Sequence, residues 1–209
     1  EAAFTTVGSI ALQGIRLAEP KLGETFLVLG LGLLGQIAVQ LLKANGCQVL
    51  ATDLDPSLIA RAEAFGAIGI YPGSDIESIC KGLTAGHGVD GVIVCAGTSS
   101  NQPIELCGAV TRLKGRVVVV GAVRMDIPRE DYFKKEISVV ISRSYGPGRY
   151  DPFYEESGND YPLAYVRFTE QRNMQTFLEL VSQKKVDVVS LITHRFLVDD
   201  AAVAYQLIE

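Results

Sequence analysis

The chain has 209 residues, of which 48% are hydrophobic and 21% are charged, and its formal net charge is −5 at pH 7. These values are typical of a globular α/β protein with one good-sized core, and an acidic chain without a basic run argues against a nucleic-acid surface. The apolar stretches are only as long as strands, so we expect no membrane-spanning segment.

The start of the chain and its cysteines predict a cytoplasmic protein. Residues 1–20 lack the basic, apolar and small-residue regions of a signal peptide. The thiols of Cys47, Cys80, Cys95 and Cys107 are spread along the chain without a Cys-x-x-Cys pair. This spacing predicts neither a disulfide framework nor a zinc site in these residues.

The first predicted strand runs into a glycine-rich turn. Residues 1–18 have the apolar face of a helix, and the segment around Pro20 ends it. Residues 26–29 are an apolar run typical of a strand buried on both faces. Gly30, Gly32 and Gly35 follow in the pattern Gly-x-Gly-x-x-Gly, and helix-forming residues come next.

Each glycine of this pattern has a mechanical role in a dinucleotide-binding turn. Gly30 allows a sharp turn out of the strand, Gly32 lets the backbone approach a pyrophosphate, and Gly35 lets the helix pack against the sheet. The N–H groups of Leu33 and Leu34 lie at the start of the helix, where they and the helix dipole favour an anion.

An acidic residue at the end of the second predicted strand supports the same site. The strand 48–52 ends in Asp53, which follows Gly35 at close to the spacing of about 20 residues expected for the acid that binds a ribose diol. The alternative is that Asp53 caps the helix that begins near Pro56, but Asp55 is better placed for that role. A carboxylate at Asp53 would repel a 2′-phosphate, which favours NAD over NADP.

The rest of the chain alternates between helices and strands, which requires a parallel sheet with helices on both faces. The first six strands predict a doubly wound, Rossmann-type α/β fold, with ligands at the carboxyl ends of the strands. Small residues at two further strand ends are expected to lie beside the glycine turn there. They are Cys95, Ala96 and Gly97 at one end and Val120, Gly121 and Ala122 at the other. We predict helices at 56–65, 75–83, 102–113, 131–135, 169–183 and 199–208, and strands at 68–71, 89–95, 117–120, 137–142 and 186–196.

Residues 144–173 differ in composition from the rest of the chain. They are rich in tyrosine, glycine, proline and acids and have no periodicity, which is typical of a functional loop. Arg143 and Arg149 could reach an anionic substrate, although ordinary surface charges explain them as well. The tyrosines Tyr145, Tyr150, Tyr154 and Tyr161 could form a substrate wall or pack onto another domain.

Several segments together resemble the medium-chain dehydrogenase/reductase superfamily of the zinc alcohol dehydrogenase type. The resemblance covers nearly all of the chain, and its specificity lies in the combination. The matching segments, in chain order, are 5–16, 28–35, 62–67, 115–121 and 191–196 together with 199–205.

The resemblance implies an organisation for the intact enzyme. Members of the family begin with a substrate-binding domain that carries zinc ligands, and the last matching segment returns to that domain. Residues 1–20 would then lead in from a substrate domain, 21–143 form the dinucleotide-binding core, 144–173 form the tyrosine-rich loop, and 174–209 return. The loop is similar to that of bacterial two-part oxidoreductases fused to a glucose-fructose oxidoreductase-like domain.

The resemblance also implies a function and a set of contacts. The chain would bind NAD for hydride transfer between nicotinamide and a carbinol or carbonyl carbon, would be inactive alone, and would have any zinc outside these residues. Two alternatives stay open: a zinc-free enzyme of the quinone reductase type, and a non-catalytic dinucleotide-sensing module. The apolar strand 137–142, at a sheet edge, predicts a homodimer. By resemblance the cofactor would contact Gly30, Gly32, Leu33, Leu34, Gly35, Asp53, Cys95, Ala96, Gly97, Val120, Gly121, Ala122 and Ser142.

Overall fold

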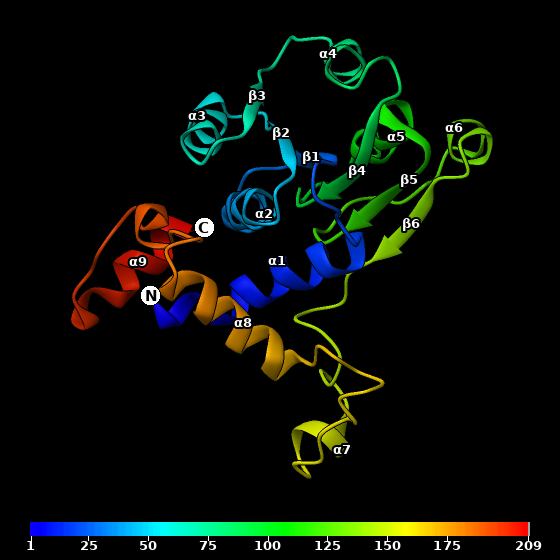
Figure 1. The fold of residues 1–209 in the computed structure, drawn as a ribbon. Coiled ribbons are helices and arrows are strands. Elements are labelled where there is room, and N and C mark those ends of the chain that lie inside the picture. Colours follow the sequence, from blue (N-terminus) through cyan, green and yellow to red (C-terminus); the bar gives the residue numbers. More distant parts are fainter. Residues whose placement is uncertain (209) are drawn as a thin grey trace.

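The computed structural model describes residues 1–208 and shows a six-stranded, all-parallel sheet with helices on both faces (Figure 1). The strand order is β3-β2-β1-β4-β5-β6, which confirms the predicted doubly wound fold. The strands are β1 (Thr25–Leu29), β2 (Gln48–Thr52), β3 (Ile68–Ile70), β4 (Val89–Val94), β5 (Thr111–Val119) and β6 (Ser138–Ile141).

The helices form one layer on each face of the sheet. One layer contains α1 (Thr5–Ala18), α2 (Leu33–Ala44), α3 (Pro56–Ala64) and α8 (Glu170–Ser182). The other contains α4 (Ile76–Leu83), α5 (Gln102–Val110) and α6 (Arg129–Lys134). The remaining elements are η1 (Ala2–Phe4), α7 (Pro152–Glu155), η2 (Val189–Leu191), η3 (Val198–Asp200) and α9 (Ala201–Ile208).

The central strand β1 is covered on both faces, which explains its apolar run from Phe26 to Leu29. All five of its residues are buried, and successive side chains enter opposite layers. Phe26 and Val28 pack with α1 and α2, whereas Leu27 and Leu29 pack with the layer of α4, α5 and α6. A strand covered on both faces needs apolar residues on both, as the sequence predicted for residues 26–29.

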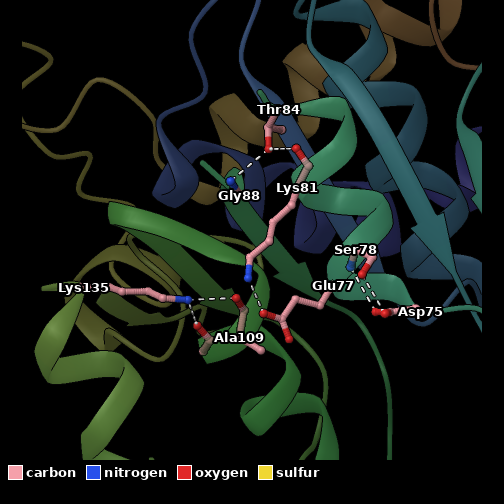
Figure 2. A network of polar contacts seen from close by, with 9 residues as sticks. Asp75, Glu77, Ser78, Lys81, Thr84, Gly88, Ala109 and Lys135 are labelled. Atoms are coloured by element: carbon pink, nitrogen blue, oxygen red, sulfur yellow. Dashed lines mark hydrogen bonds and ion pairs between the residues drawn. The ribbon is translucent and has the colours of Figure 1, made fainter. Parts of the chain in front are cut away.

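Figure 2 shows the polar contacts that fix α4 and its surroundings. Asp75 is the N-cap of α4, because its carboxylate accepts from the backbone N–H of Ser78 at 3.0 Å. The hydroxyl of Thr84 at the other end accepts from Gly88 N–H at 2.9 Å and closes the turn into β4. Lys135 Nζ donates to Ala109 O at 2.8 Å, so an ammonium group caps the C-terminal end of α5.

The predicted boundary between α5 and β5 was wrong. The helix was expected to extend to residue 113 and the strand to begin at 117, but α5 ends at Val110 and β5 begins at Thr111. Thr111 is buried, pairs with Val89 on β4 and donates its hydroxyl to Cys107 O at 2.6 Å. A β-branched residue with a strand partner thus ends the helix before its apolar pattern does.

The predicted strand at 186–196 was also wrong. This segment contains only the short helix η2 and irregular backbone. Val186, Val188 and Leu191 are buried against the layer of α1 and α2, so their apolar character reflects packing on helices. The sheet ends at β3 and β6, and the segment pairs with neither edge.

The tyrosine-rich loop leaves the end of β6 and extends away from the sheet before α8 brings the chain back (Figure 1). Its first part packs on helices, since Asn173 Nδ2 donates to Tyr145 O at 2.9 Å and to Gln13 Oε1 at 3.2 Å. The farther part contains the four-residue helix α7. Within residues 1–208, no helix combines the length and the apolar character needed to cross a membrane.

Candidate functional site

The candidate site lies where neighbouring strands β1 and β4 lead to opposite halves of the sheet. From β1 the chain continues to β2 and β3 on one side, whereas β4, β5 and β6 extend the sheet on the other side. Ligands of open parallel sheets bind at such a switch point, outside the carboxyl ends of the strands. The glycine turn follows β1 at this place, and Asp53 follows the adjacent β2.

The three glycines of the turn have different surroundings. Gly30 has a φ of 87°, and a Cβ there would lie 2.6 Å from Ala96 N. A Cβ on Gly35 would lie 1.9 Å from Gly30 O, so the first turn of α2 packs directly on the loop. A Cβ on Gly32 would meet nothing within 4 Å, which leaves space for a ligand against its backbone. The predicted sharp turn at Gly30 is confirmed, whereas Gly35 makes its close contact with the loop after β1 and not with the sheet itself.

The N-terminus of α2 presents free donors to that space. Gly32 is the N-cap and offers no side chain, and its carbonyl accepts from Gln36 N at 2.9 Å. Within the described residues, the N–H groups of Leu33, Leu34 and Gly35 have no hydrogen-bond acceptor. Such free groups at the positive end of a helix dipole fit a phosphate.

Asp53 connects the end of β2 to the glycine turn. Its Oδ2 accepts from Leu31 N at 2.6 Å, and its Oδ1 accepts from Asp55 N at 3.0 Å. The cap of α3 is Asp55, which accepts from Ser57 N at 2.8 Å. The half-buried Asp53 carboxylate therefore does not cap α3, and each of its oxygens retains a lone pair for a hydroxyl group.

The other predicted residues lie along the same edge of the sheet. Cys95 N donates to Leu29 O at 2.8 Å, Gly121 N donates to Val94 O at 2.9 Å, and Ser142 N donates to Val119 O at 2.8 Å. The ends of β1, β4, β5 and β6 are therefore in register, with Ala96, Gly97, Val120 and Ala122 between them. A Cβ on Gly121 would lie 2.1 Å from Ala96 O, so strand packing alone requires this glycine.

The thiols of the chain do not fit a zinc site. Burial raises the pKa of Cys80 to about 11 and that of Cys95 to about 12, and it also raises the pKa of Cys47 and Cys107. Thiolates are the form that binds metal, so these groups are poor ligands at neutral pH. Among residues 1–208, no three His, Cys, Asp or Glu side chains gather to hold a metal ion.

A pocket of about 390 Å³ adjoins the glycine turn and adds Gln36, Thr193 and His194 to the predicted site residues Gly32 and Leu33. Gly32 and Leu33 form one wall, and Thr193 and His194 of the C-terminal segment form another. Gln36 also lines the pocket and donates Nε2 to Leu31 O at 3.0 Å and to Leu58 O at 2.8 Å. For Gln36, the sequence signal was a polar residue within the otherwise apolar first half of α2.

Comparison with known proteins identifies the family. Residues 34–158, more than half of the chain, match the family model described as zinc-binding dehydrogenase. The chain belongs to this family. The match covers the glycine turn from Leu34 onward, the strands β2 to β6 and the start of the tyrosine-rich loop.

Individual relatives of the zinc-binding dehydrogenase chain agree with this assignment. The sorbitol dehydrogenase of Halalkalibacterium halodurans is 29% identical over 90% of this chain and 49% of its own length. The NADP-dependent isopropanol dehydrogenase of Thermoanaerobacter brockii is 29% identical over 88% of this chain and 48% of its own length. The chain therefore spans about half the length of these curated relatives.

A solved structure confirms the fold of this dehydrogenase family member. Alcohol dehydrogenase TADH from Thermus sp. ATN1 has a TM-score of 0.80 and 20% sequence identity, over 99% of this chain and 55% of that chain. The Rossmann-like fold and its role in binding a nicotinamide dinucleotide thus follow from family and fold together. None of these relatives bears the name of a two-part oxidoreductase, so the fusion to a second domain stays a prediction.

Proposed function

We propose that this chain is the NAD(H)-binding part of an alcohol, polyol or sugar dehydrogenase that transfers hydride between nicotinamide and a carbinol or carbonyl carbon. The single observation that carries the preference for NAD is the position of Asp53. Its carboxylate lies at the end of β2 and is fixed by Leu31 N–H beside the glycine turn. A 2′-phosphate at this place would meet a negative charge, whereas a ribose diol would donate to it.

The residues of the site divide the work of binding. The free N–H groups of Leu33, Leu34 and Gly35 would hold the pyrophosphate, and Asp53 would accept from the adenosine ribose. Backbone groups at the ends of β4, β5 and β6, from Cys95 to Ser142, would line the path towards the nicotinamide. The bound cofactor supplies the hydride chemistry, and the protein positions the ring and excludes water.

Calorimetric titration of the chain with NADH and NADPH tests the proposal. We expect tighter binding of NADH, and we expect Asp53→Ala to remove or equalise the preference. Asp55→Ala is the matched control, because it removes a nearby carboxylate that caps α3 and should leave the preference intact. Equal affinities for the two cofactors in the wild type would contradict the NAD preference.

We further propose that turnover needs a substrate domain, which would adjoin residues 1–20 and 174–209. The chain alone would then bind cofactor without oxidising alcohol. No step is assigned to a metal in these residues, because their thiols do not fit one. The protein is proposed to act in the cytoplasm as a homodimer paired through the edge strand β6. Alcohol oxidation by this chain alone would overturn the first of these proposals.

A further inference from the structure

A basic pocket of about 430 Å³ lies where the C-terminal ends of three helices meet. Ala44 ends α2, Ala64 ends α3, and the turn after α8 supplies Lys184 and Lys185. The charged and amide side chains that line it are Gln40, Lys43, Arg61, Lys184, Lys185 and Asp187. Its volume is within the range of small-molecule sites.

The four cations of this basic pocket are not neutralised by acidic side chains. In the described part of the chain, Lys43, Arg61, Lys184 and Lys185 form no ion pair and donate no side-chain hydrogen bond. Asp187 is the only acid in the lining. Its carboxylate is engaged by Ser190 Oγ, by Ser190 N at 3.1 Å and by Val189 N at 2.9 Å.

The helix ends account for only part of this positive charge. Lys43 and Arg61 lie in the last turns of α2 and α3, where a cation stabilises the negative end of the helix dipole. The four cations are opposed by Asp187, with one negative charge, and by three helix ends, with roughly −0.5 charge each. A surplus of roughly 1.5 positive charges therefore remains in the pocket. A surplus above one unit favours an anion with more than one charge.

The floor of the basic pocket is rigid. The buried amide of Gln40 accepts from Asp187 N at 2.6 Å and donates to Asp187 O at 3.2 Å, so it holds the segment after α8 onto α2. Lys43 lies along the backbone of Gly66, where a Cβ would come within 3.3 Å of its Cε. These contacts fix the backbone that carries the cations and lower the cost of ordering them around a ligand.

We propose that the basic pocket binds a small phosphoanion with more than one charge, such as inorganic diphosphate or the diphosphate group of a nucleotide. It is separate from the pocket at the glycine turn and shares only Arg61 with it. Arg61 is therefore left unchanged in the test, because its substitution could also alter cofactor binding at the glycine turn.

Calorimetric titration with inorganic diphosphate at low ionic strength, with NADH saturating the cofactor site at the glycine turn, tests this site. We expect one equivalent to bind the wild type, and Lys43→Gln/Lys185→Gln to weaken binding by roughly twenty-fivefold, or roughly fivefold per exposed charge. The control, Lys114→Gln/Lys134→Gln, changes the net charge equally at exposed lysines of β5 and α6 and should bind as the wild type does. A parallel titration with ADP, again with NADH saturating the cofactor site, distinguishes the two ligands: a nucleotide site would bind ADP more tightly than free diphosphate.

Two results would overturn the proposal: no binding of diphosphate by the wild type, or equal weakening in both double variants. NADH titrations of the same variants separate this site from the cofactor site. We expect unchanged NADH affinity in both, because neither lysine pair lines the pocket at the glycine turn. Thermal melting of each variant verifies that it is folded.

Discussion

Gly32 and Gly35 lie three positions apart, yet the structure requires glycine at only one of them for packing. Gly35 is in contact with Gly30 O, and no side chain fits between them. Gly32 has a φ of −61°, which any residue can adopt, and open space beside it. The fold itself therefore requires glycine at position 35 but does not require it at position 32.

Alanine substitutions separate these two roles. Gly32→Ala should leave the free energy of unfolding within about 0.5 kcal/mol of the wild type but weaken NADH binding by about tenfold, because the new methyl group occupies the ligand side. Gly35→Ala should lower the stability by about 2 kcal/mol, because backbone must move to admit the Cβ. Chemical denaturation and NADH titration measure the two effects. Unchanged NADH affinity in Gly32→Ala would show that this backbone does not face the cofactor.

At the scale of elements, α1 and α8 form a pair that is joined by polar as well as apolar contacts. Phe177 of α8 is fully buried against Gly8 of α1, where a Cβ would lie 2.2 Å from its ring. Arg16 Nε donates to Asn173 Oδ1 at 2.6 Å, and its guanidinium lies 3.2 Å from the centre of the Phe168 ring. Burial and the nearby Arg167 lower the pKa of Arg16 to about 10. Asn173 supplies a hydrogen-bond acceptor to this partly buried guanidinium.

Asn173→Ala should destabilise the protein by about 3 kcal/mol. The substitution removes hydrogen bonds to Arg16, to Gln13 and to the tyrosine-rich loop at Tyr145, and each buried group left without a partner costs about 1–3 kcal/mol. Gln175→Ala, at an exposed position of the same helix, is the control and should change stability by less than about 0.5 kcal/mol. Urea denaturation monitored by circular dichroism gives both values. Equal stabilities of the two variants would contradict this role for Asn173.

The sequence could predict the elements whose signals are local. Residue types and spacing were enough to predict the buried run of β1, the glycine turn after it and the position of Asp53 at the end of β2. The segment 186–196 could not be predicted, because buried valines occur both in strands and in coil packed on helices. The positions of Thr193 and His194 at the glycine turn depend on packing between distant parts of the chain, which no short pattern records.

At the scale of the whole molecule, the sheet has two free edges, and they differ in length. β3 has three residues, whereas β6 has four and ends in Ile141, which is 55% exposed. The glycine turn and the basic pocket lie on the β1 and β2 side of the sheet, away from β6. Pairing of two copies through β6 would therefore leave both pockets open.

The proposed homodimer can be tested at Ile141. Ile141→Lys places a charge on the edge strand, which opposes strand pairing between copies, so we expect a dimeric wild type and a monomeric variant in analytical ultracentrifugation. Leu178→Lys, at an exposed apolar position of α8, is the matched control and should stay dimeric. The strands β4 and β5 lie between β6 and the glycine turn, and the proposed cofactor contacts beside β6 are made by backbone, so the change of the Ile141 side chain should leave NADH affinity as in the wild type. A monomeric wild type at high concentration would rule out this interface for the chain.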